Sequence, residues 1–308
     1  MSTEQTVLAT KRAHLGIRCR VVQIIRNFFL DEGFLEVHTP VRTPAPAPEL
    51  HIDAVACSGW FLCTSPELYM KRLLAAGYQK IFQMAPVFRA GERGALHHPE
   101  FMLLEWYRLG ADYAVLQADC RELLRTIGHR LGKSDGFHSR GRWLEIGGDW
   151  PTVTVREAFR QFAGWEPGSN PDADRFDLDL VEKVEPNLGF PTPAFLLDYP
   201  ASQAALARLK THDPTVAERF ELYWAGIELA NGFSELTEPG EQRERFSEAN
   251  QARRQAGRAV YPVAESFLQS LHHLQPCAGI ALGVDRLVLI LADATDLDQV
   301  VAFPPEMA

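Results

Sequence analysis

The strand-like segments of this chain are joined by long connections rather than by regular strand–helix–strand units. Segments with strand character cover residues 34–37, 60–63, 80–88, 99–108 and 218–231, and a last one begins at Cys277. Segments with helical periodicity or helix-start residues cover 12–32, Ser65 to Gly77, 113–131 and 241–257, and a last one begins at Asp285. Residues 40–48 contain four prolines and predict a rigid loop, whereas 132–215 show no clear pattern. Parallel sheets need regular crossovers, so this order predicts an α+β fold around a mostly antiparallel sheet.

The charge balance and the apolar segments argue against several classes of protein. Lys and Arg number 31 against 40 Asp and Glu, and the net charge of −9 argues against a nucleic-acid binder with a broad basic face. The longest apolar run, Leu287 to Ala292, is far shorter than the roughly 20 residues that cross a bilayer. No secretory signal is visible, and the five cysteines include no Cys-x-x-Cys pair. We therefore expect a cytoplasmic protein without a disulfide framework, a zinc ribbon or a membrane segment.

Residues 88–101 are the first candidate for nucleotide binding. The chain has neither a P-loop nor a G-x-G-x-x-G turn, so a phosphate site must be built differently. Arg89 ends one predicted strand, Phe101 lies near the start of the next, and the loop between them is rich in Gly, Arg and His. A guanidinium suits bidentate contact with a phosphate or carboxylate, and an aromatic ring offers a stacking face for a base. Taken alone, these residues are more typical of a hairpin with a solvated basic tip.

Acidic residues gather in the segment 221–235. Glu228, Asn231 and Glu235 could line one cleft, and Glu221 precedes Glu228 by seven residues. On a single strand over 218–231, that spacing places Glu221 and Glu228 on opposite faces unless a bulge intervenes. The spacing alone therefore predicts no shared magnesium site, and an ordinary edge strand and turn is the simpler interpretation.

Small residues alternate along the last predicted strand. Gly279, Ala281 and Gly283 leave one strand face without bulky side chains, so a ligand can lie flat against the backbone. Arg286 then stands at the start of a helix, where a phosphate is favoured. Close packing of a helix on the sheet would explain the small residues equally well.

Taken in this order, the three segments resemble motifs 2 and 3 of the class II aminoacyl-tRNA synthetases, and residues 33–40 resemble motif 1. The runs TSPELYMKRLL, HHPEFMLLEWY and ELANGFSEL are similar to the catalytic domain of lysyl-tRNA synthetases, and the resemblance covers residues 12–304. The variants LLEWYR and GIALGVDR, together with the lack of room for an N-terminal OB-fold that reads the anticodon, resemble the elongation factor P–lysine ligase family. Those enzymes attach (R)-β-lysine to a lysine of elongation factor P.

The resemblance implies one catalytic domain over residues 1–308, with a six-stranded antiparallel sheet flanked by helices. It implies that ATP and Mg²⁺ activate (R)-β-lysine or lysine for transfer to elongation factor P. It also implies a homodimer and no stable binding of tRNA. Two other functions remain open: a truncated lysyl-tRNA synthetase-like enzyme with another acceptor, tRNA included, and a non-catalytic paralogue that binds lysine or a translation factor.

The resemblance also implies how ATP is bound. Arg89 is expected to clamp the α-phosphate and the substrate carboxylate, Phe101 to stack on adenine, and Arg286 to reach the γ-phosphate. Glu228 and Glu221 match magnesium-binding acids. The further residues expected to contact ATP are Glu92, His97, His98, Leu229 and Gly283.

A second set of residues matches the amino-acid pocket. Ser65 and Glu67 correspond to residues that meet the substrate amino group near its carboxylate. Tyr107 and Glu235 correspond to the pair that holds the distal ammonium, at the opposite end of the cleft. Ala281 stands where lysyl-tRNA synthetases have glycine. The further residues expected to contact the amino acid are Pro66 and Asn231.

The chain departs from the family pattern at two positions in the motif 2 loop. Gly91 stands where the family has an acidic residue, and Glu92 is the expected substitute. His98 replaces an asparagine, so an ATP contact must be remade by His98 or lost. Arg93 is the exposed charge expected to meet an acceptor protein, with a solvated loop tip as the alternative.

Overall fold

The computed structural model describes residues 3–307. The α-helices are α1 (Thr3–Thr10), α2 (Arg12–Asp31), α3 (Glu67–Ala75), α4 (Tyr113–Leu131), α5 (Val155–Ala158), α6 (Ala173–Asp179), α7 (Pro239–Gln255), α8 (Glu265–Ser270) and α9 (Val284–Leu291). The strands are β1 (Leu35–Glu36), β2 (Arg42–Thr43), β3 (Ala56–Cys57), β4 (Trp60–Leu62), β5 (Lys80–Phe88), β6 (Glu100–Leu109), β7 (Phe137–Ser139), β8 (Arg142–Leu144), β9 (Thr152–Thr154), β10 (Ala194–Pro200), β11 (Leu209–Lys210), β12 (Asp213–Trp224), β13 (Ile227–Ser234) and β14 (Cys277–Gly283). Within residues 3–307, none of the helices is both long and apolar enough to cross a membrane.

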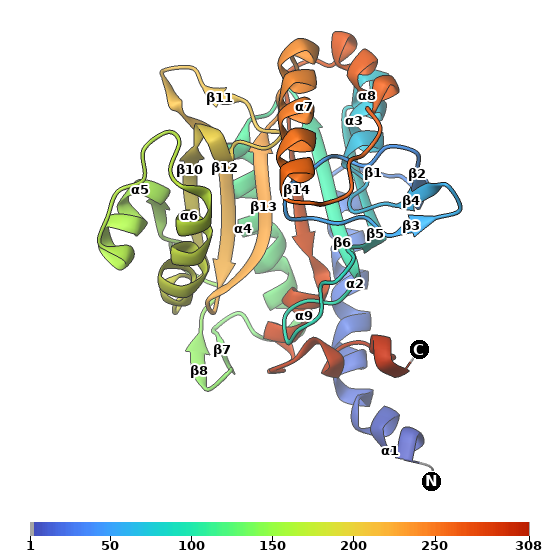
Figure 1. The fold of residues 1–308 in the computed structure, drawn as a ribbon. Coiled ribbons are helices and arrows are strands. Elements are labelled where there is room, and N and C mark those ends of the chain that lie inside the picture. The colour runs from blue at the N-terminus through green and yellow to red at the C-terminus, as the bar shows by residue number, and fades with distance from the viewer. Residues whose placement is uncertain (1–2, 308) are drawn as a thin grey trace.

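A nine-stranded sheet forms the centre of the molecule (Figure 1). Its main path runs β1-β5-β6-β14-β13-β12-β10-β9, and β11 pairs with β12. The neighbouring strands from β5 to β10 along this path are all antiparallel. The parallel pairs are β1 with β5 and β10 with β9. The expected six-stranded antiparallel sheet is therefore the middle of a larger sheet that short strands extend at both edges.

The segment 218–231 is not one strand, as its alternation predicts, but part of a hairpin. β12 ends at Trp224, β13 begins at Ile227, and these two residues pair with each other. Ala225 and Gly226 form the turn, with φ of 56° and 70°. Two consecutive left-handed residues give the hairpin turn that matches the twist of antiparallel strands. The prediction was wrong because a two-residue turn interrupts the alternation of apolar and polar residues only briefly.

Local sequence signals explain most other boundaries. Asp112 caps α4 by accepting hydrogen bonds from the backbone N–H groups of Ala114 and Val115, and the helix ends at Gly132 with φ of 70°. α2, α4 and α7 and strands β5 and β6 lie within a few residues of their predicted positions. The proline-rich loop contains the short strand β2, and the unassigned segment 132–215 supplies α5, α6, β9 and β10.

Helices cover both faces of the sheet. On the first face, α2, α4 and α9 enclose an apolar core that includes Trp106, Phe220 and Leu282. On the second face, α3, α7 and α8 pack against a smaller core that includes Tyr107 and Phe233. Figure 1 shows α4 behind the strands and α7 in front of them. The charged residues of the candidate site lie on the second face.

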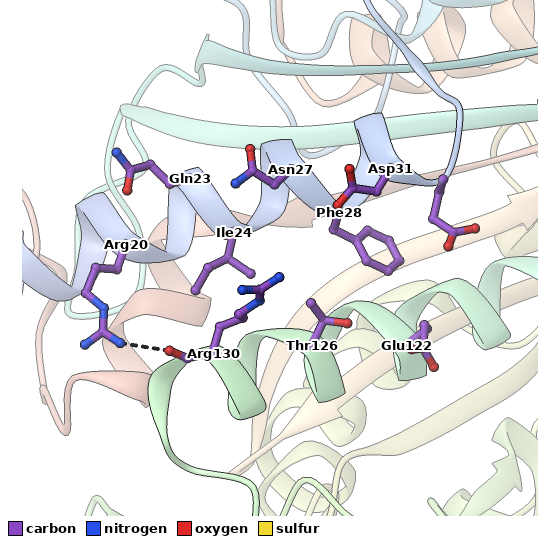
Figure 2. A pocket seen from close by; sticks show the side chains of 10 residues that line it. Arg20, Gln23, Ile24, Asn27, Phe28, Asp31, Glu122, Thr126 and Arg130 are labelled. Carbon is purple, nitrogen blue, oxygen red and sulfur yellow. Dashed lines mark hydrogen bonds between the residues drawn. The ribbon is translucent and has the colours of Figure 1, made fainter.

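A cavity of about 370 Å³ lies between α2 and α4 (Figure 2). Mostly polar side chains line it, and Arg20 donates a hydrogen bond to the carbonyl oxygen of Arg130 at 2.9 Å. Because α2 and α4 cover the first face, the sheet separates this cavity from the charged residues of the second face.

Candidate active site

Two neighbouring rows of residues cross the second face of the sheet. In the first row, strand pairing places Glu105, Ala281, Asn231 and Glu221 side by side on β6, β14, β13 and β12. Residues paired on adjacent strands share a face, so these four side chains border the same space. Three of them, all but Glu105, are expected site residues that the sheet brings together from distant parts of the chain.

The second row consists of Tyr107, Gly279, Phe233 and Arg219 on the same four strands. A Cβ atom at Gly279 would overlap the ring of Tyr107 and come too close to Oε1 of Glu235. Glycine is needed here because two side chains of the site lie against the backbone of β14. The small residue Gly279 therefore makes room for site residues rather than for a packed helix.

Glu105 is not among the residues expected from the sequence, yet it is a buried carboxylate within the first row. Ser65 donates a hydrogen bond to its Oε1 at 2.6 Å, and Tyr107 donates one to its Oε2 at 2.8 Å. Burial, followed by the charge of Glu67, raises the pKa of Glu105 to about 8, although the two hydrogen bonds oppose this shift. No described cation forms an ion pair with Glu105, so its charge is available to an ammonium group.

Ser65 also fixes the start of α3. Its hydroxyl oxygen accepts a hydrogen bond from the backbone N–H of Glu67 at 3.0 Å. The carbonyl oxygen of Pro66 accepts from the N–H groups of Tyr69 and Met70 and so closes the first turn. This turn places the side chain of Ser65 beside Glu105 and that of Glu67 beside Lys71.

Glu67 and Glu235 do not lie at opposite ends of a cleft, as the resemblance predicts. Both carboxylates form ion pairs with the ammonium group of Lys71, which lies one helical turn after Glu67 on α3. Lys71 is 0% exposed. Oε1 of Glu235 is buried and has no hydrogen-bond partner within the described chain. The two acids lie close together because Lys71 stands four residues after Glu67 on α3. This spacing places the ammonium group beside Glu67, where it also reaches Glu235.

Glu221 and Glu228 share one face of the β12–β13 hairpin. Glu228 pairs with Tyr223, two residues from Glu221, and a register shift follows at that point. The prediction of opposite faces was wrong because it assumed a single strand. Arg219 donates to Oε1 of Glu221 at 2.7 Å, and the Tyr223 hydroxyl donates to Oε2 at 2.6 Å. Burial, followed by the charge of Glu228, raises the pKa of Glu221.

A third acid, Glu185, lies near Glu221 and Glu228. It belongs to residues 132–215, the segment in which the sequence shows no clear pattern. One of its oxygens lies 3.2 Å from the hydroxyl of Tyr223. Burial, followed by the charges of Glu228 and Glu221, raises the pKa of Glu185 to about 7. Closely spaced acids of this kind repel one another and favour a bound cation.

Arg286 lies at the start of α9 and connects three parts of the site. Its guanidinium donates to the carboxylate of Glu228 at 3.1 Å and to the carbonyl oxygen of Leu96 at 3.2 Å. It also lies 2.7 Å from Nε2 of His97. Burial, followed by the charge of Arg286, lowers the pKa of His97, so the neutral imidazole accepts this hydrogen bond. A bound triphosphate could replace these acceptors.

Arg89 follows β5 and faces the first residues of β6. Its guanidinium lies 5.1 Å from the ring centre of Phe101 and 3.9 Å from the carboxylate of Glu92. Its Nε is buried and has no hydrogen-bond partner among the described residues. A buried, unsatisfied guanidinium nitrogen points to an anionic ligand, because leaving such a donor unpaired is costly.

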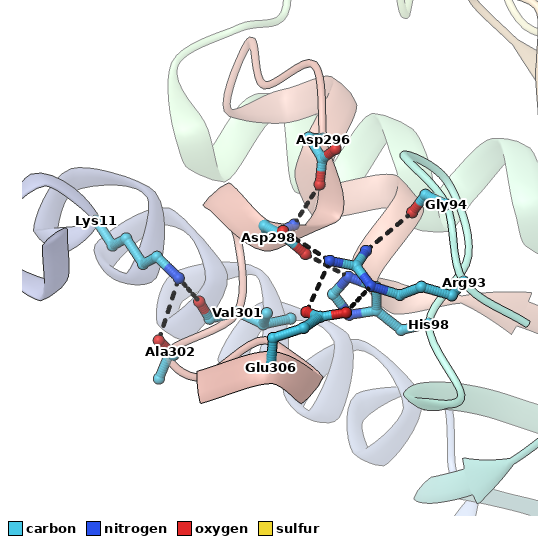
Figure 3. Close-up of polar contacts among 9 residues, drawn as sticks. All are labelled: Lys11, Arg93, Gly94, His98, Asp296, Asp298, Val301, Ala302 and Glu306. Atoms are coloured by element: carbon cyan, nitrogen blue, oxygen red, sulfur yellow. Dashed lines mark hydrogen bonds and ion pairs between the residues drawn. The ribbon is translucent and has the colours of Figure 1, made fainter. Parts of the chain in front are cut away.

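The tip of the motif 2 loop is bound to the C-terminal segment (Figure 3). Arg93 forms ion pairs with Asp298 at 2.9 Å and with Glu306 at 2.7 Å. The buried ring of His98 lies 2.8 Å from the same Asp298. His98 therefore faces the C-terminal segment and not the ATP contacts expected of it, and Arg93 is not a free charge. Asp296, Asp298 and His98 are close enough to share a metal ion, but Asp298 already forms an ion pair with Arg93.

Two expected ATP contacts have limited side-chain roles. The side chain of Leu229 packs in the core of the first face, so only its backbone borders the site. Gly283 ends β14 beside the side chain of Arg286.

Comparison with known proteins places this arrangement in a family. A family model described as "tRNA synthetases class II (D, K and N)" matches residues 5–307. Proteins named elongation factor P–(R)-β-lysine ligase are 38% identical to the chain in Vibrio cholerae and 40% identical in Yersinia enterocolitica, and both alignments cover 95% of each chain. The relative of the same name in Sodalis glossinidius is 40% identical over 96% of each chain. The chain belongs to the elongation factor P–(R)-β-lysine ligase family. It is a ligase of the class II synthetase type.

Sequence reasoning within this family misses Glu105, Lys71, Arg219 and Glu185. Glu105 and Tyr107 stand two apart on one strand, so their shared face is readable from the sequence. Lys71 lies four residues after Glu67, which predicts a helical pair. No local pattern indicates Glu185, because its approach to Glu221 depends on tertiary packing.

Proposed function

We propose that this chain uses ATP to activate (R)-β-lysine, or lysine, as an aminoacyl-adenylate and transfers it to a lysine side chain of elongation factor P. One observation carries the proposal. Buried carboxylates on the second face of the sheet suit two ammonium groups, and two arginines beside them suit phosphates: Arg286, which donates to Glu228, and Arg89, whose Nε has no hydrogen-bond partner among the described residues. The proposal includes a homodimer, a cytoplasmic location and no stable binding of tRNA.

The phosphate side of the site supports adenylate formation. The substrate carboxylate attacks the α-phosphorus of ATP, and pyrophosphate leaves. Arg89, with its unpaired Nε, is suited to hold the carboxylate and the α-phosphate in line. Arg286 at the start of α9 is suited to the departing phosphates, where its charge contact strengthens as the bond breaks.

The acids of the β12–β13 hairpin fit a magnesium ion. Glu221 and Glu228 share a face, are close enough to raise the pKa of Glu221, and offer the oxygen ligands that Mg²⁺ prefers. Such an ion would neutralise charge on the ATP phosphates. Arg219 donates a hydrogen bond to one oxygen of Glu221, whereas Glu228 accepts a hydrogen bond from Arg286.

The amino-acid side supports a substrate with two ammonium groups. Glu105 and Glu235 present carboxylate oxygens that no described cation fully neutralises. A charge-assisted hydrogen bond between a buried carboxylate and an ammonium is worth about 1.5–3 kcal/mol. A monoamino acid of the same length would leave one of these acids without a partner.

The transfer step needs a neutral amine from the acceptor. The lysine ε-amine attacks the carbonyl carbon of the adenylate, the new amide bond forms, and AMP leaves. The ammonium first loses one proton to water or buffer, and the attacking nitrogen loses a second proton as the amide forms. Because the amine attacks the adenylate directly, no covalent intermediate with the enzyme is needed.

We expect elongation factor P, and not bulk tRNA, to accept the activated amino acid. The net charge of −9 gives the chain no positive electrostatic field that would attract and orient the tRNA polyanion. The test incubates the enzyme and ATP with each lysine isomer and both acceptors, then measures the protein mass and the charging of tRNA. Charged tRNA with unmodified elongation factor P would instead indicate a minimal synthetase. Absence of lysine-dependent pyrophosphate exchange would indicate a non-catalytic paralogue.

We expect Ala281→Gly to raise the use of α-lysine relative to (R)-β-lysine. Ala281 lies between Glu105 and Asn231 in the first row, so its methyl group narrows the floor of the pocket beside both side chains. A steric difference of this size is typically worth about 1–3 kcal/mol. The measurement is pyrophosphate exchange with each isomer. The matched control is Ala278→Gly, which removes a methyl group from the opposite face of β14. An isomer ratio unchanged by Ala281→Gly would place the discrimination elsewhere.

A further inference from the structure

We propose that Lys71 is a positioning residue that sets the net charge of the amino-acid pocket and thereby matches it to a substrate with two ammonium groups. The inference rests on the proposed function and adds a specificity-determining residue to it. Lys71 lies on α3, within the run TSPELYMKRLL, but it is not among the site residues expected from the sequence.

The surroundings of Lys71 are those of a fixed internal cation. Its side chain is 0% exposed and forms ion pairs with Glu67 and Glu235. Its ammonium nitrogen also lies 5.4 Å from the ring centre of Phe233 and 5.9 Å from that of Phe267. Burial alone lowers the pKa of Lys71, but the two carboxylates raise it above its usual value. Lys71 is therefore charged at neutral pH.

In the described chain, Lys71 is the only cation that forms an ion pair with the carboxylates around it, although the charges of Glu49 and Glu67 interact and Arg208 acts on Cys277. The titratable side chains that surround Lys71 come from three elements and the residue after β13, and are Glu67 on α3, Glu105 and Tyr107 on β6, Glu235 after β13 and Cys277 on β14. The neighbouring helix α8 contributes only an aromatic ring, that of Phe267. When its acids are ionised, the pocket therefore contains three carboxylates and one ammonium, a net charge of −2. Lysine and β-lysine each bring two ammonium groups.

Lys71 also decides which oxygen of Glu235 faces the substrate. It pairs with Oε2, and Oε1 is left without a partner beside Gly279 and Tyr107. Without Lys71, Glu235 would lose the contact that fixes this orientation. The pocket would then contain three carboxylates with no internal cation, and one of them would keep a proton at neutral pH.

The sign of the pH effect follows from these groups. The charge of Lys71 lowers the pKa of both Glu235 and Glu105 against the opposing effect of burial. Removing that charge raises both pKa values, so a substrate with two ammonium groups must displace an additional proton to bind. Affinity should fall most at neutral pH and recover as the pH rises and the acids ionise. A packing defect would weaken binding equally at each pH.

The experiment compares Lys71→Met with the parent in lysine-dependent pyrophosphate exchange between pH 7 and pH 9. We expect the KM for the amino acid to rise at least about tenfold at pH 7, and this increase to shrink by several-fold at pH 9, while the KM for ATP stays close to the parent value. Calorimetry in two buffers of different ionisation enthalpy should show more protons released on binding to the variant at pH 7. Lys210→Met is the matched control, because it breaks the lysine–carboxylate pair with Asp198 outside the pocket.

A charge-compensated variant keeps the test decisive if Lys71→Met does not fold. Lys71→Met combined with Glu67→Gln restores the net charge of −2 with two acids and no lysine. We expect its KM for the amino acid to show the pH dependence of the parent, even if the KM itself is higher. A pH-independent loss in Lys71→Met, or a double variant that keeps a shifted pH dependence, would overturn the role of Lys71. Parent enzyme with no lysine-dependent exchange would overturn the proposed function itself.

Discussion

Arg89→Ala and Arg286→Ala should each reduce adenylate formation by at least about 100-fold while leaving the fold intact. Among residues 3–307, Arg89 has a buried Nε without a hydrogen-bond partner, and the acceptors that Arg286 meets belong to Glu228, Leu96 and His97. Neither guanidinium is part of an apolar core. Each provides a charge contact that strengthens as pyrophosphate departs, so its loss acts on the transition state more than on folding.

Pyrophosphate exchange with lysine and (R)-β-lysine measures this effect, and thermal unfolding reports on the fold. Arg243→Ala is the matched control, because it removes an arginine that forms an exposed ion pair with Glu265. Such surface pairs contribute little to stability. Exchange within tenfold of the parent in either active-site variant would contradict the assignment of that arginine.

Glu235→Gln should lower the affinity for a lysine-like substrate by more than about tenfold. The substitution keeps the shape of the side chain but removes the negative charge beside Tyr107 and Gly279. Because a Cβ at Gly279 would already collide with Oε1 of Glu235, the site leaves the amide little room to turn away. The variant also loses the ion pair between position 235 and Lys71, although Lys71 keeps its ion pair with Glu67.

Direct binding of each lysine isomer, measured by calorimetry, tests the role of Glu235. Glu238→Gln is a suitable control, since Glu238 is exposed and lies three residues further along the same segment. Unchanged affinity in Glu235→Gln would make Glu235 a structural residue and would move the distal ammonium site elsewhere, toward Glu105.

Local patterns in the sequence were sufficient for much of the fold and for part of the site. The periodicity of α2 and α4, the strands on either side of Arg89 and the alternation of Gly279, Ala281 and Gly283 all act over a few residues. Such patterns indicate which side of a strand or helix is buried, and the same side is buried in the folded protein. They also predicted an antiparallel sheet, although they missed the short strands at its edges.

Pairing between distant segments decided the rest. Only the turn at Ala225 and Gly226 brings Glu221 and Glu228 to one face, and only the packing of α3 on the sheet brings Lys71 between Glu67 and Glu235. Likewise, Asp298 at the C-terminal end draws in His98, which a motif would assign to ATP. These contacts join residues up to 200 positions apart. The sequence alone determined the family, and it predicted the arginines and most of the acids of the candidate site. The tertiary structure decided which charges face one another, because strand register and long-range packing leave no trace in local periodicity.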